Sequence, residues 1–227
     1  MTTTNPLRIG LVLFPGFQAL DAFGPIDCLN VLSRTYPLTL SILSHTLDPV
    51  STAVSSSSSS TPTSSTPIAI SQSVVPTHTF STAPDLDVLL VPGGLGTRLL
   101  DSDSIKASIE FIADVYPSLQ YLITVCTGSA LAAKAGVLDG KKATTNKRAF
   151  KEVTAWREDV EWVARARWVV DGNVWTSSGV SAGIDVILAW IGSVYGEEVA
   201  RGIAVGFEYT RHEDAEEDPF AGLYGLV

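Results

Sequence analysis

The stretch "YLITVCTGSALAAKAGVLDG" (Tyr121–Gly140) decides how this chain is read. Its apolar and β-branched run Leu122–Cys126 predicts a buried strand, and Thr127–Ser129 then breaks the pattern. Ala130–Ala135 predicts an Ala/Leu helix that Gly136 can end. A strand that turns sharply into a helix presents its junction side chain outside the sheet. The stretch therefore predicts a nucleophile elbow, with cysteine in the position that serine holds in the hydrolases.

The thiol at this corner can be interpreted in two ways. The free N–H groups and the positive dipole end of the following helix would lie beside it, which predicts a lowered pKa and a thiolate at neutral pH. Alternatively, Cys126 is a small hydrophobic residue at a strand end, because free cysteines are often buried. The stretch alone does not decide between these alternatives.

The rest of the chain alternates strand and helix patterns, with one low-complexity exception. Alternation of this kind predicts one α/β domain over residues 1–227, with a doubly wound, mostly parallel sheet covered by helices on both faces. The Ser/Thr/Pro-rich segment Ser51–Pro67 predicts a flexible surface insertion. The predicted strands are Leu7–Phe14, Leu38–Ser44 and Asp87–Gly94. Leu20–Arg34 predicts a turn followed by a helix entered at Gly24-Pro25, and the other predicted helices are Asp101–Tyr116, Ala182–Tyr195 and Glu197–Phe207. Trp168–Gly179 predicts a hairpin around Asp171-Gly172.

Composition excludes several classes of function. The net charge of −9 and a pI of about 4.7 argue against binding to nucleic acid. Two cysteines give no disulfide framework, so we expect a reduced, cytoplasmic protein. No stretch approaches the run of about 18 apolar residues that a membrane-spanning helix needs. We therefore expect no membrane partner.

Unusual residues gather where three predicted strands end, and ligands bind at such ends in doubly wound sheets. Cys126 ends one strand, and Gly93 and Gly94 end another with backbone N–H groups available to an anion. Asp21 follows the first strand in an apolar context. It is either a helix cap or a buried carboxyl with a raised pKa. No Cys, His and carboxylate cluster has metal-ligand spacing, so we expect no metal.

Together these segments resemble the ThiJ/PfpI superfamily, whose flavodoxin-like fold is related to class I glutamine amidotransferases. The resemblance rests on "LVLFPGFQALDAFGPID", "VLLVPGG", "VCTGSALAAKAGVLDGKKATT", "TSSGVSAGID" and "GFEY". Within the superfamily the chain looks most like the isocyanide (isonitrile) hydratases and the amidotransferase-like domain of AraC-type regulators. We expect no DNA-binding domain, because the chain ends soon after "AGLYGLV" and is acidic.

The resemblance implies a cofactor-independent enzyme that forms a homodimer and acts on a small molecule. It makes Cys126 the nucleophile and Asp21 the acid beside it. Many relatives have histidine where this chain has Asn146, which disfavours His-assisted hydrolysis. The remaining residues that the resemblance implies for oxyanion or substrate binding are Gly93, Gly94, Thr127, Gly179 and Val180, the last two within the pocket segment Ser178–Gly183.

The favoured function is hydration of an isonitrile to an N-substituted formamide through a covalent thioimidate on Cys126. A glyoxalase-like hydratase of 2-oxoaldehydes ranks lower because it usually enlists a histidine. A cysteine peptidase ranks lower still, since Thr127 stands where that branch has histidine. A non-catalytic sensor whose cysteine oxidises to sulfinic acid is the alternative from a different class.

Overall fold

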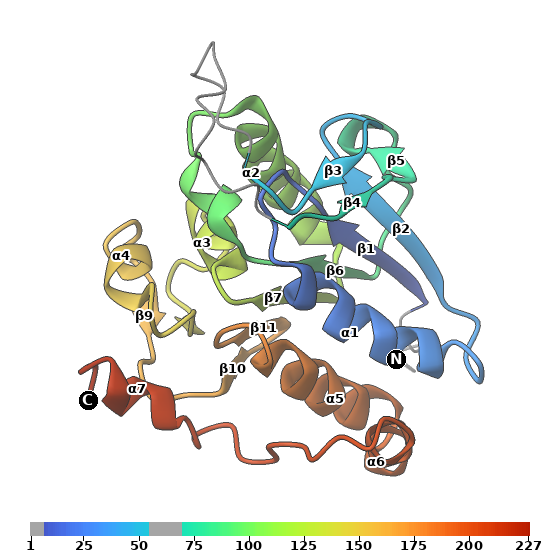
Figure 1. Ribbon diagram of the computed structural model, residues 1–227, viewed down its shortest axis with the longest axis vertical. Helices are drawn as coiled ribbons and strands as arrows, with labels where there is room; N and C mark the ends of the chain where they lie inside the picture. The colour runs from blue at the N-terminus through green and yellow to red at the C-terminus, as the bar shows by residue number, and fades with distance from the viewer. Residues whose placement is uncertain (1–6, 55–69) are drawn as a thin grey trace.

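The computed structural model describes residues 7–54 and 70–227 (Figure 1). The strands are β1 (Arg8–Val12), β2 (Thr39–Ser44), β3 (Val50–Ser51), β4 (Ser73–Val74), β5 (His78–Thr79), β6 (Val88–Val91), β7 (Tyr121–Val125), β8 (Lys142–Ala143), β9 (Glu161–Trp162), β10 (Trp168–Asp171) and β11 (Val174–Ser177). The helices are α1 (Ala19–Leu32), α2 (Asp103–Val115), α3 (Gly128–Lys134), α4 (Phe150–Thr154), α5 (Ala182–Tyr195), α6 (Glu197–Gly206) and α7 (Pro219–Leu223), with short 3-10 turns at Phe80–Thr82, Leu95–Arg98 and Tyr116–Ser118.

A seven-stranded sheet in the order β10-β11-β7-β6-β1-β2-β5 forms the centre of the fold. Every neighbouring pair is parallel except β10 and β11, which form the predicted hairpin. All four residues of β6 are buried, as expected for a strand covered on both faces. Helices α2 and α3 cover one face, and α1 and α5 cover the other (Figure 1). The predicted doubly wound α/β fold is confirmed.

The order of the strands fixes where a site can form. From β1 the chain runs outward through β2 to β5, and then returns to β6 on the other side of β1. The chain direction therefore switches between β1 and β6, and the carboxyl edge of the sheet at such a point is the usual ligand crevice of doubly wound folds. Here the two loops that follow these strands are joined, since the N–H of Gln18 donates to the carbonyl of Gly93 at 2.8 Å. Strand β7 lies next to β6, so its carboxyl end borders the same crevice.

Helix α1 begins at Ala19, so the predicted helix entry at Gly24-Pro25 is wrong. Pro25 lies inside the helix although it has no N–H to offer the carbonyl of Asp21, a loss that usually weakens a helix. Packing outweighs this cost, because Gly24 and Pro25 are both buried. A Cβ on Gly24 would lie only 2.9 Å from Cγ1 of Ile184 on α5. Close contact between α1 and α5 therefore fixes this helix.

The start of the predicted insertion belongs to the folded structure. Ser51 pairs with Ser73 across β3 and β4, and its carbonyl accepts a hydrogen bond from the N–H of Gly16 at 2.8 Å. The rest of the predicted insertion, residues 55–67, lies outside the described residues. Within the described ranges, no helix has the length and apolarity needed to cross a membrane.

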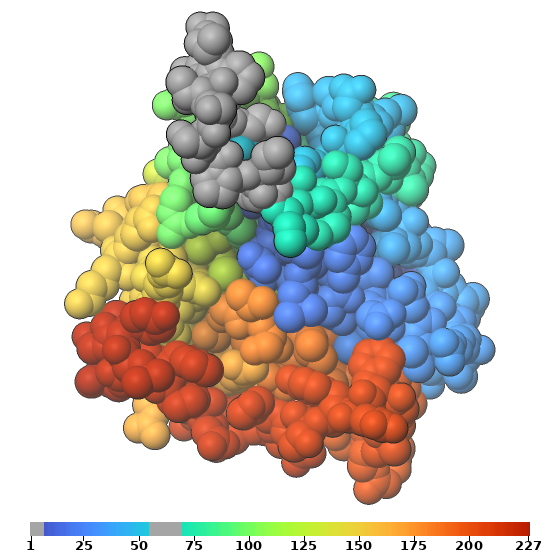
Figure 2. All heavy atoms as spheres, in the orientation of Figure 1, coloured from blue at the N-terminus to red at the C-terminus, as the bar shows by residue number. Residues whose placement is uncertain are grey.

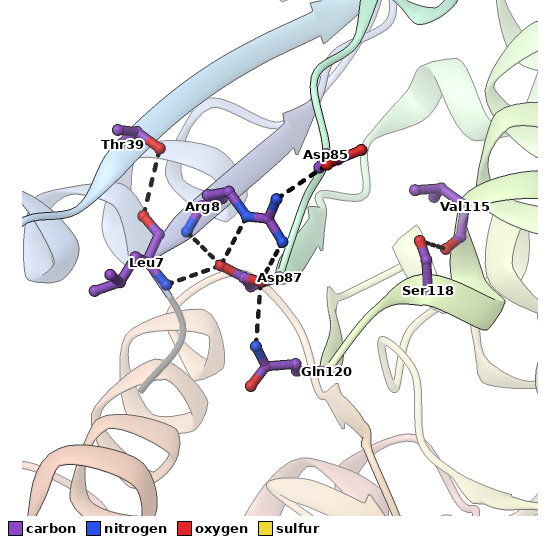
Figure 3. A network of polar contacts seen from close by, with 8 residues as sticks. All are labelled: Leu7, Arg8, Thr39, Asp85, Asp87, Val115, Ser118 and Gln120. Atoms are coloured by element: carbon purple, nitrogen blue, oxygen red, sulfur yellow. Dashed lines mark hydrogen bonds and ion pairs between the residues drawn. The ribbon is translucent and has the colours of Figure 1, made fainter. Parts of the chain in front are cut away.

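At the opposite edge of the sheet, Asp87 joins the beginnings of three strands (Figure 3). Its carboxylate accepts hydrogen bonds from the backbone N–H groups of Leu7 and Arg8, from the Arg8 guanidinium and from the Gln120 amide. The guanidinium of Arg8 lowers the pKa of Asp87 to about 2. This edge is a structural clamp, and the residues predicted for function lie at the other end of the strands.

Candidate active site

The predicted elbow is present where β7 ends and α3 begins. Cys126 has a φ of +58°, a left-handed backbone conformation that costs a non-glycine residue on the order of 1–3 kcal/mol. Its N–H donates to the carbonyls of Ser177 and Ser178 at 3.2 and 3.0 Å. Its own carbonyl accepts from the hydroxyls of Ser129 and Thr145, both at 3.0 Å. Four hydrogen bonds thus hold the strained corner in place.

Asp21 lies in the first turn of α1 and is only 2% exposed. Its Oδ2 accepts a hydrogen bond from the backbone N–H of Gly93 at 3.0 Å, while Oδ1 is buried with no nitrogen or oxygen partner among the described residues. Gln18 occupies the N-cap position of α1, so Asp21 does not cap the helix. Burial raises the pKa of Asp21 to about 7, against hydrogen bonds from Gly93 and from the Cys126 thiol. The structure therefore agrees with the interpretation of Asp21 as a buried carboxyl and not as a helix cap.

The thiol of Cys126 differs from the expectation of a lowered pKa. Burial, followed by the negative charge of Asp21, raises its pKa to about 12. Three donors oppose this rise: the backbone N–H groups of Thr127 and Val180 and the side chain of Asn146. Helix α3, which follows the thiol, has only seven residues. The resting thiol is therefore protonated, and it becomes a strong nucleophile only if its proton moves to Asp21.

Gly93 and Gly94 serve the site differently from the expectation. The N–H of Gly94 donates to the hydroxyl of Thr127 at 3.0 Å, and Thr97 donates to the same hydroxyl at 3.1 Å. The N–H of Gly94 is therefore engaged by Thr127 rather than free for the oxyanion binding that the resemblance implies. Gly93 leaves no room for a side chain, because a Cβ there would lie 2.5 Å from the nitrogen of Thr127 and 3.0 Å from Oδ2 of Asp21.

Val180 and Asn146 approach the sulfur from the other side. Val180 has a φ of +47°, which is unusual for a β-branched residue, and its N–H reaches the thiol. The Asn146 side-chain oxygen accepts from the N–H of Ala149 at 3.1 Å, which leaves the amide nitrogen as the donor to the sulfur. A Cβ on Gly179 would lie 2.3 Å from that nitrogen. Gly179 therefore makes room for the Asn146 amide.

A pocket of about 540 Å³ opens onto the thiol, a size typical of small-molecule sites. The pocket is lined by four of the predicted site residues: Gly94, Cys126, Thr127 and Val180. Asp21 does not line it but is hydrogen-bonded to the thiol. Gly93 holds Asp21, and Gly179 lines an adjoining cavity of about 290 Å³ that α7 borders. The other residues lining the main pocket are Gln18, Leu95, Arg98, Asn146, Arg148 and Ala149.

Sequence reasoning missed most of these additional residues. In the sequence, Asn146 stands out only as a departure from the family pattern, and its position directly after Ala143–Thr145 is the one feature that points to the site. Arg98 and Arg148 have no distinguishing sequence context, because single surface arginines are common. The C-terminal segment, red in Figure 2, lies against the segment coloured yellow that contains α4. No sequence pattern placed that segment beside the pocket.

Comparison with known proteins gives a consistent result. The DJ-1/PfpI family matches residues 7–192. The chain is 34% identical to an isonitrile hydratase of Pseudomonas putida over 203 residues, which are 89% of this chain and 78% of that protein. It is 29% identical to the HTH-type transcriptional regulator GbdR of Pseudomonas aeruginosa over 67% of this chain but only 41% of the regulator.

Solved structures show the same fold. A ThiJ/PfpI family protein from Pseudomonas syringae superposes with a TM-score of 0.69 and 26% identity, covering 97% of this chain and 86% of that one. Drosophila melanogaster DJ-1beta shares the fold at a TM-score of 0.68 and 19% identity, covering 90% of this chain and 98% of its own. With the sheet, the elbow and these matches in agreement, the chain belongs to the DJ-1/PfpI (ThiJ/PfpI) family.

Proposed function

We propose that this protein is a cysteine-dependent hydratase that converts an isonitrile to an N-substituted formamide. The observation that carries the proposal is the buried pair of Cys126 and Asp21 at a pocket of small-molecule size. The similarity to the isonitrile hydratase of Pseudomonas putida supports a hydratase at the level of the family. Both protonation states of Asp21 are accessible near neutral pH, as a group that accepts and returns a proton requires.

In the first step, the sulfur of Cys126 bonds to the terminal isonitrile carbon. Asp21 takes the thiol proton as the bond forms and delivers it to that carbon. The product is a thioimidate, R–N=CH–S–Cys, in which the substrate and the thiol together account for every atom. The N–H groups of Thr127 and Val180 and the Asn146 amide, which face the sulfur, stabilise negative charge as it develops there.

In the second step, water adds to the thioimidate carbon. Asp21, now a carboxylate again, accepts a proton from the water and passes it to the nitrogen of the substrate. When the carbon–sulfur bond then breaks, the carboxylate takes the proton of the new hydroxyl group and delivers it to the sulfur. The products are R–NH–CHO and the free thiol, so one water is consumed and the enzyme is restored. One carboxyl thus acts as a base and then as an acid each time a proton moves.

The pocket lining favours this reaction over its closest alternative. A glyoxalase-like hydratase usually enlists a histidine, and among the described residues lining the pocket there is none. Asn146, which reaches the thiol, can donate a hydrogen bond but cannot transfer a proton at neutral pH.

A substrate panel tests the proposal. An aryl isonitrile and methylglyoxal are offered to the wild type and to Cys126→Ala, and product is followed beyond one equivalent of enzyme. We expect catalytic formamide production from the isonitrile, abolished by the substitution. Turnover of methylglyoxal alone would replace the proposal with the 2-oxoaldehyde alternative. A single change of mass on the cysteine, without turnover, would leave a redox sensor.

We also propose that the protein acts as a homodimer in the cytoplasm. A groove of about 390 Å³ lies between α1 and α5; Asp27 and Asn30 line it together with apolar residues, which include the exposed side chains of Leu20 and Phe23. A second copy would cover these side chains. Two free, buried cysteines are consistent with a reducing compartment.

A further inference from the structure

The charges that line the active-site pocket are of one sign. Arg98 and Arg148 both line it, and no aspartate or glutamate does so among the described residues. The chain as a whole carries a net charge of −9. A positive lining in so acidic a protein attracts anions to this pocket, whereas the surrounding surface repels them.

The two arginines differ in how they are held. Arg98 forms a two-pronged contact with Glu152, with Nε–Oε1 and Nη2–Oε2 distances of 3.0 and 2.8 Å, so its charge is largely matched. Arg148 is exposed and has no hydrogen bond or ion pair with any other part of the described chain. The only basic side chain next to it in sequence, Lys147, is buried and faces Asp218 at 3.5 Å. Arg148 therefore has its full hydrogen-bonding fork available to a ligand.

The other residues that line the pocket indicate what the rest of a bound ligand would look like. Leu95, Ala149 and Val180 provide apolar wall, and the reactive thiol marks where the isonitrile carbon must lie. Arg148 also lines the adjoining cavity, so it stands at the border of the pocket rather than beside the sulfur. A molecule that fills this space has a reactive end, an apolar middle and a polar end near a guanidinium.

We propose that the substrate carries a carboxylate at the end remote from the isonitrile, and that Arg148 binds it. A carboxylate matches the guanidinium fork with two parallel hydrogen bonds. This inference names the substrate class of the proposed hydratase and rests on that function for the reacting group. Arg148 would be a specificity residue, since it contacts the substrate away from the reacting atoms.

The charge preference of the pocket can be tested without turnover. 4-(Iodoacetamido)benzoic acid and its methyl ester react with the same thiol and carry their polar group one aromatic ring away from the reacting carbon, but only the acid carries a carboxylate. The ratio of their alkylation rates at Cys126 is measured by peptide mass mapping in the wild type, in Arg148→Gln and in Arg201→Gln. Arg201 is an exposed arginine on α6 with a 65% exposed side chain, and it does not line the pocket. We expect the ratio to fall about fivefold in Arg148→Gln only, the scale of one partly exposed ion pair.

Substrate kinetics test the inference on the reaction itself. An isonitrile with a para-carboxylate on its ring is compared with its methyl ester. We expect the acid to have the lower KM, with Arg148→Gln raising KM for the acid about fivefold, leaving kcat and the ester unchanged.

The two experiments separate the two proposals. If the alkylation ratio falls as expected but neither isonitrile is turned over, the anion site stands and the proposed function fails. If both isonitriles are turned over with equal kcat/KM and Arg148→Gln alters neither, the function stands and the anion site is refuted. An equal fall of the ratio in Arg201→Gln would also refute it, because overall charge would then explain the effect.

Discussion

The substitution Asp21→Asn should make the protein more stable and far less active. Asparagine has the size of aspartate, and its carbonyl oxygen can still accept the hydrogen bond that Gly93 donates to Oδ2 at 3.0 Å. What it loses is the ability to hold a charge and to move a proton. Because Asp21 is 2% exposed, its charge is costly in the folded state, and removing that charge relieves the cost.

The magnitude follows from the pKa of Asp21, which rises from 3.8 to about 7 on folding. A group with a raised pKa in the folded state holds its proton more tightly there. Its favourable contribution is therefore complete below its unfolded pKa and is lost as the pH rises through the folded pKa. Across this pH range the free energy of unfolding of the wild type falls by about 4 kcal/mol, and about 2 to 3 kcal/mol of this fall occurs between pH 5 and 8. The asparagine variant has no such loss.

Urea unfolding of both proteins at about pH 5 and pH 8 measures this difference. We expect the stability advantage of Asp21→Asn to grow with pH, while kcat on the isonitrile falls by about 10²-fold or more, the scale of a lost general acid and base. If the stability advantage of Asp21→Asn over the wild type does not change with pH, the raised pKa of the buried Asp21 carboxyl is refuted. A well-folded variant with near-normal kcat would refute the proton transfer and leave Asp21 as a structural residue.

Three further substitutions and measurements test the rest of the site. Gly179→Ala should lower kcat about tenfold with little change in Tm, because its Cβ would lie 2.3 Å from the Asn146 amide nitrogen and displace that amide from the sulfur. Gly202→Ala, where the Cβ meets open space, is the control and should leave kcat unchanged. Limiting iodoacetamide, read by mass mapping, should label Cys126 before Cys28, because Cys126 lines the active-site pocket whereas Cys28 has no exposed surface. The reverse order would contradict the assignment of the nucleophile. Phe23→Glu should shift light scattering from a dimer to a monomer at micromolar concentration, and a wild-type protein that is already monomeric would exclude the dimer.

Much of the fold could be predicted because local pattern and tertiary packing agree. The predicted helix Ala182–Tyr195 matches α5 residue for residue, and the hairpin at Asp171-Gly172 is where its turn residues place it. Prediction failed at Gly24-Pro25, where proline suggests a helix start and close packing against α5 requires a helix interior. A single sequence does not contain that contact, which joins residues far apart in the chain.

The candidate site also has features that could be predicted from the sequence and features that could not. Cys126 and Asp21 could be located because each is a reactive residue in an otherwise apolar segment. The pKa of Cys126 could not be predicted, because the helix dipole is a local effect whereas its burial and its contact with Asp21 depend on residues far away in the sequence. Arg98 ends the 3-10 turn Leu95–Arg98, and Arg148 lies in the turn just before α4, so only the folded chain brings them to one pocket.

The direction of the Cys126 pKa also separates the proposed enzyme from a redox sensor. Oxidation of a cysteine follows its thiolate character and its exposure, so sensors hold an accessible thiolate at rest. Here burial and the neighbouring carboxylate keep the thiol protonated, and the residue is 6% exposed. A buried thiol with a raised pKa does not match that pattern. Hydration of an isonitrile needs no resting thiolate, since the proton that leaves the sulfur is the one that the isonitrile carbon must receive. A protonated thiol beside a carboxyl whose pKa is about 7 therefore suits this addition better than it suits sensing.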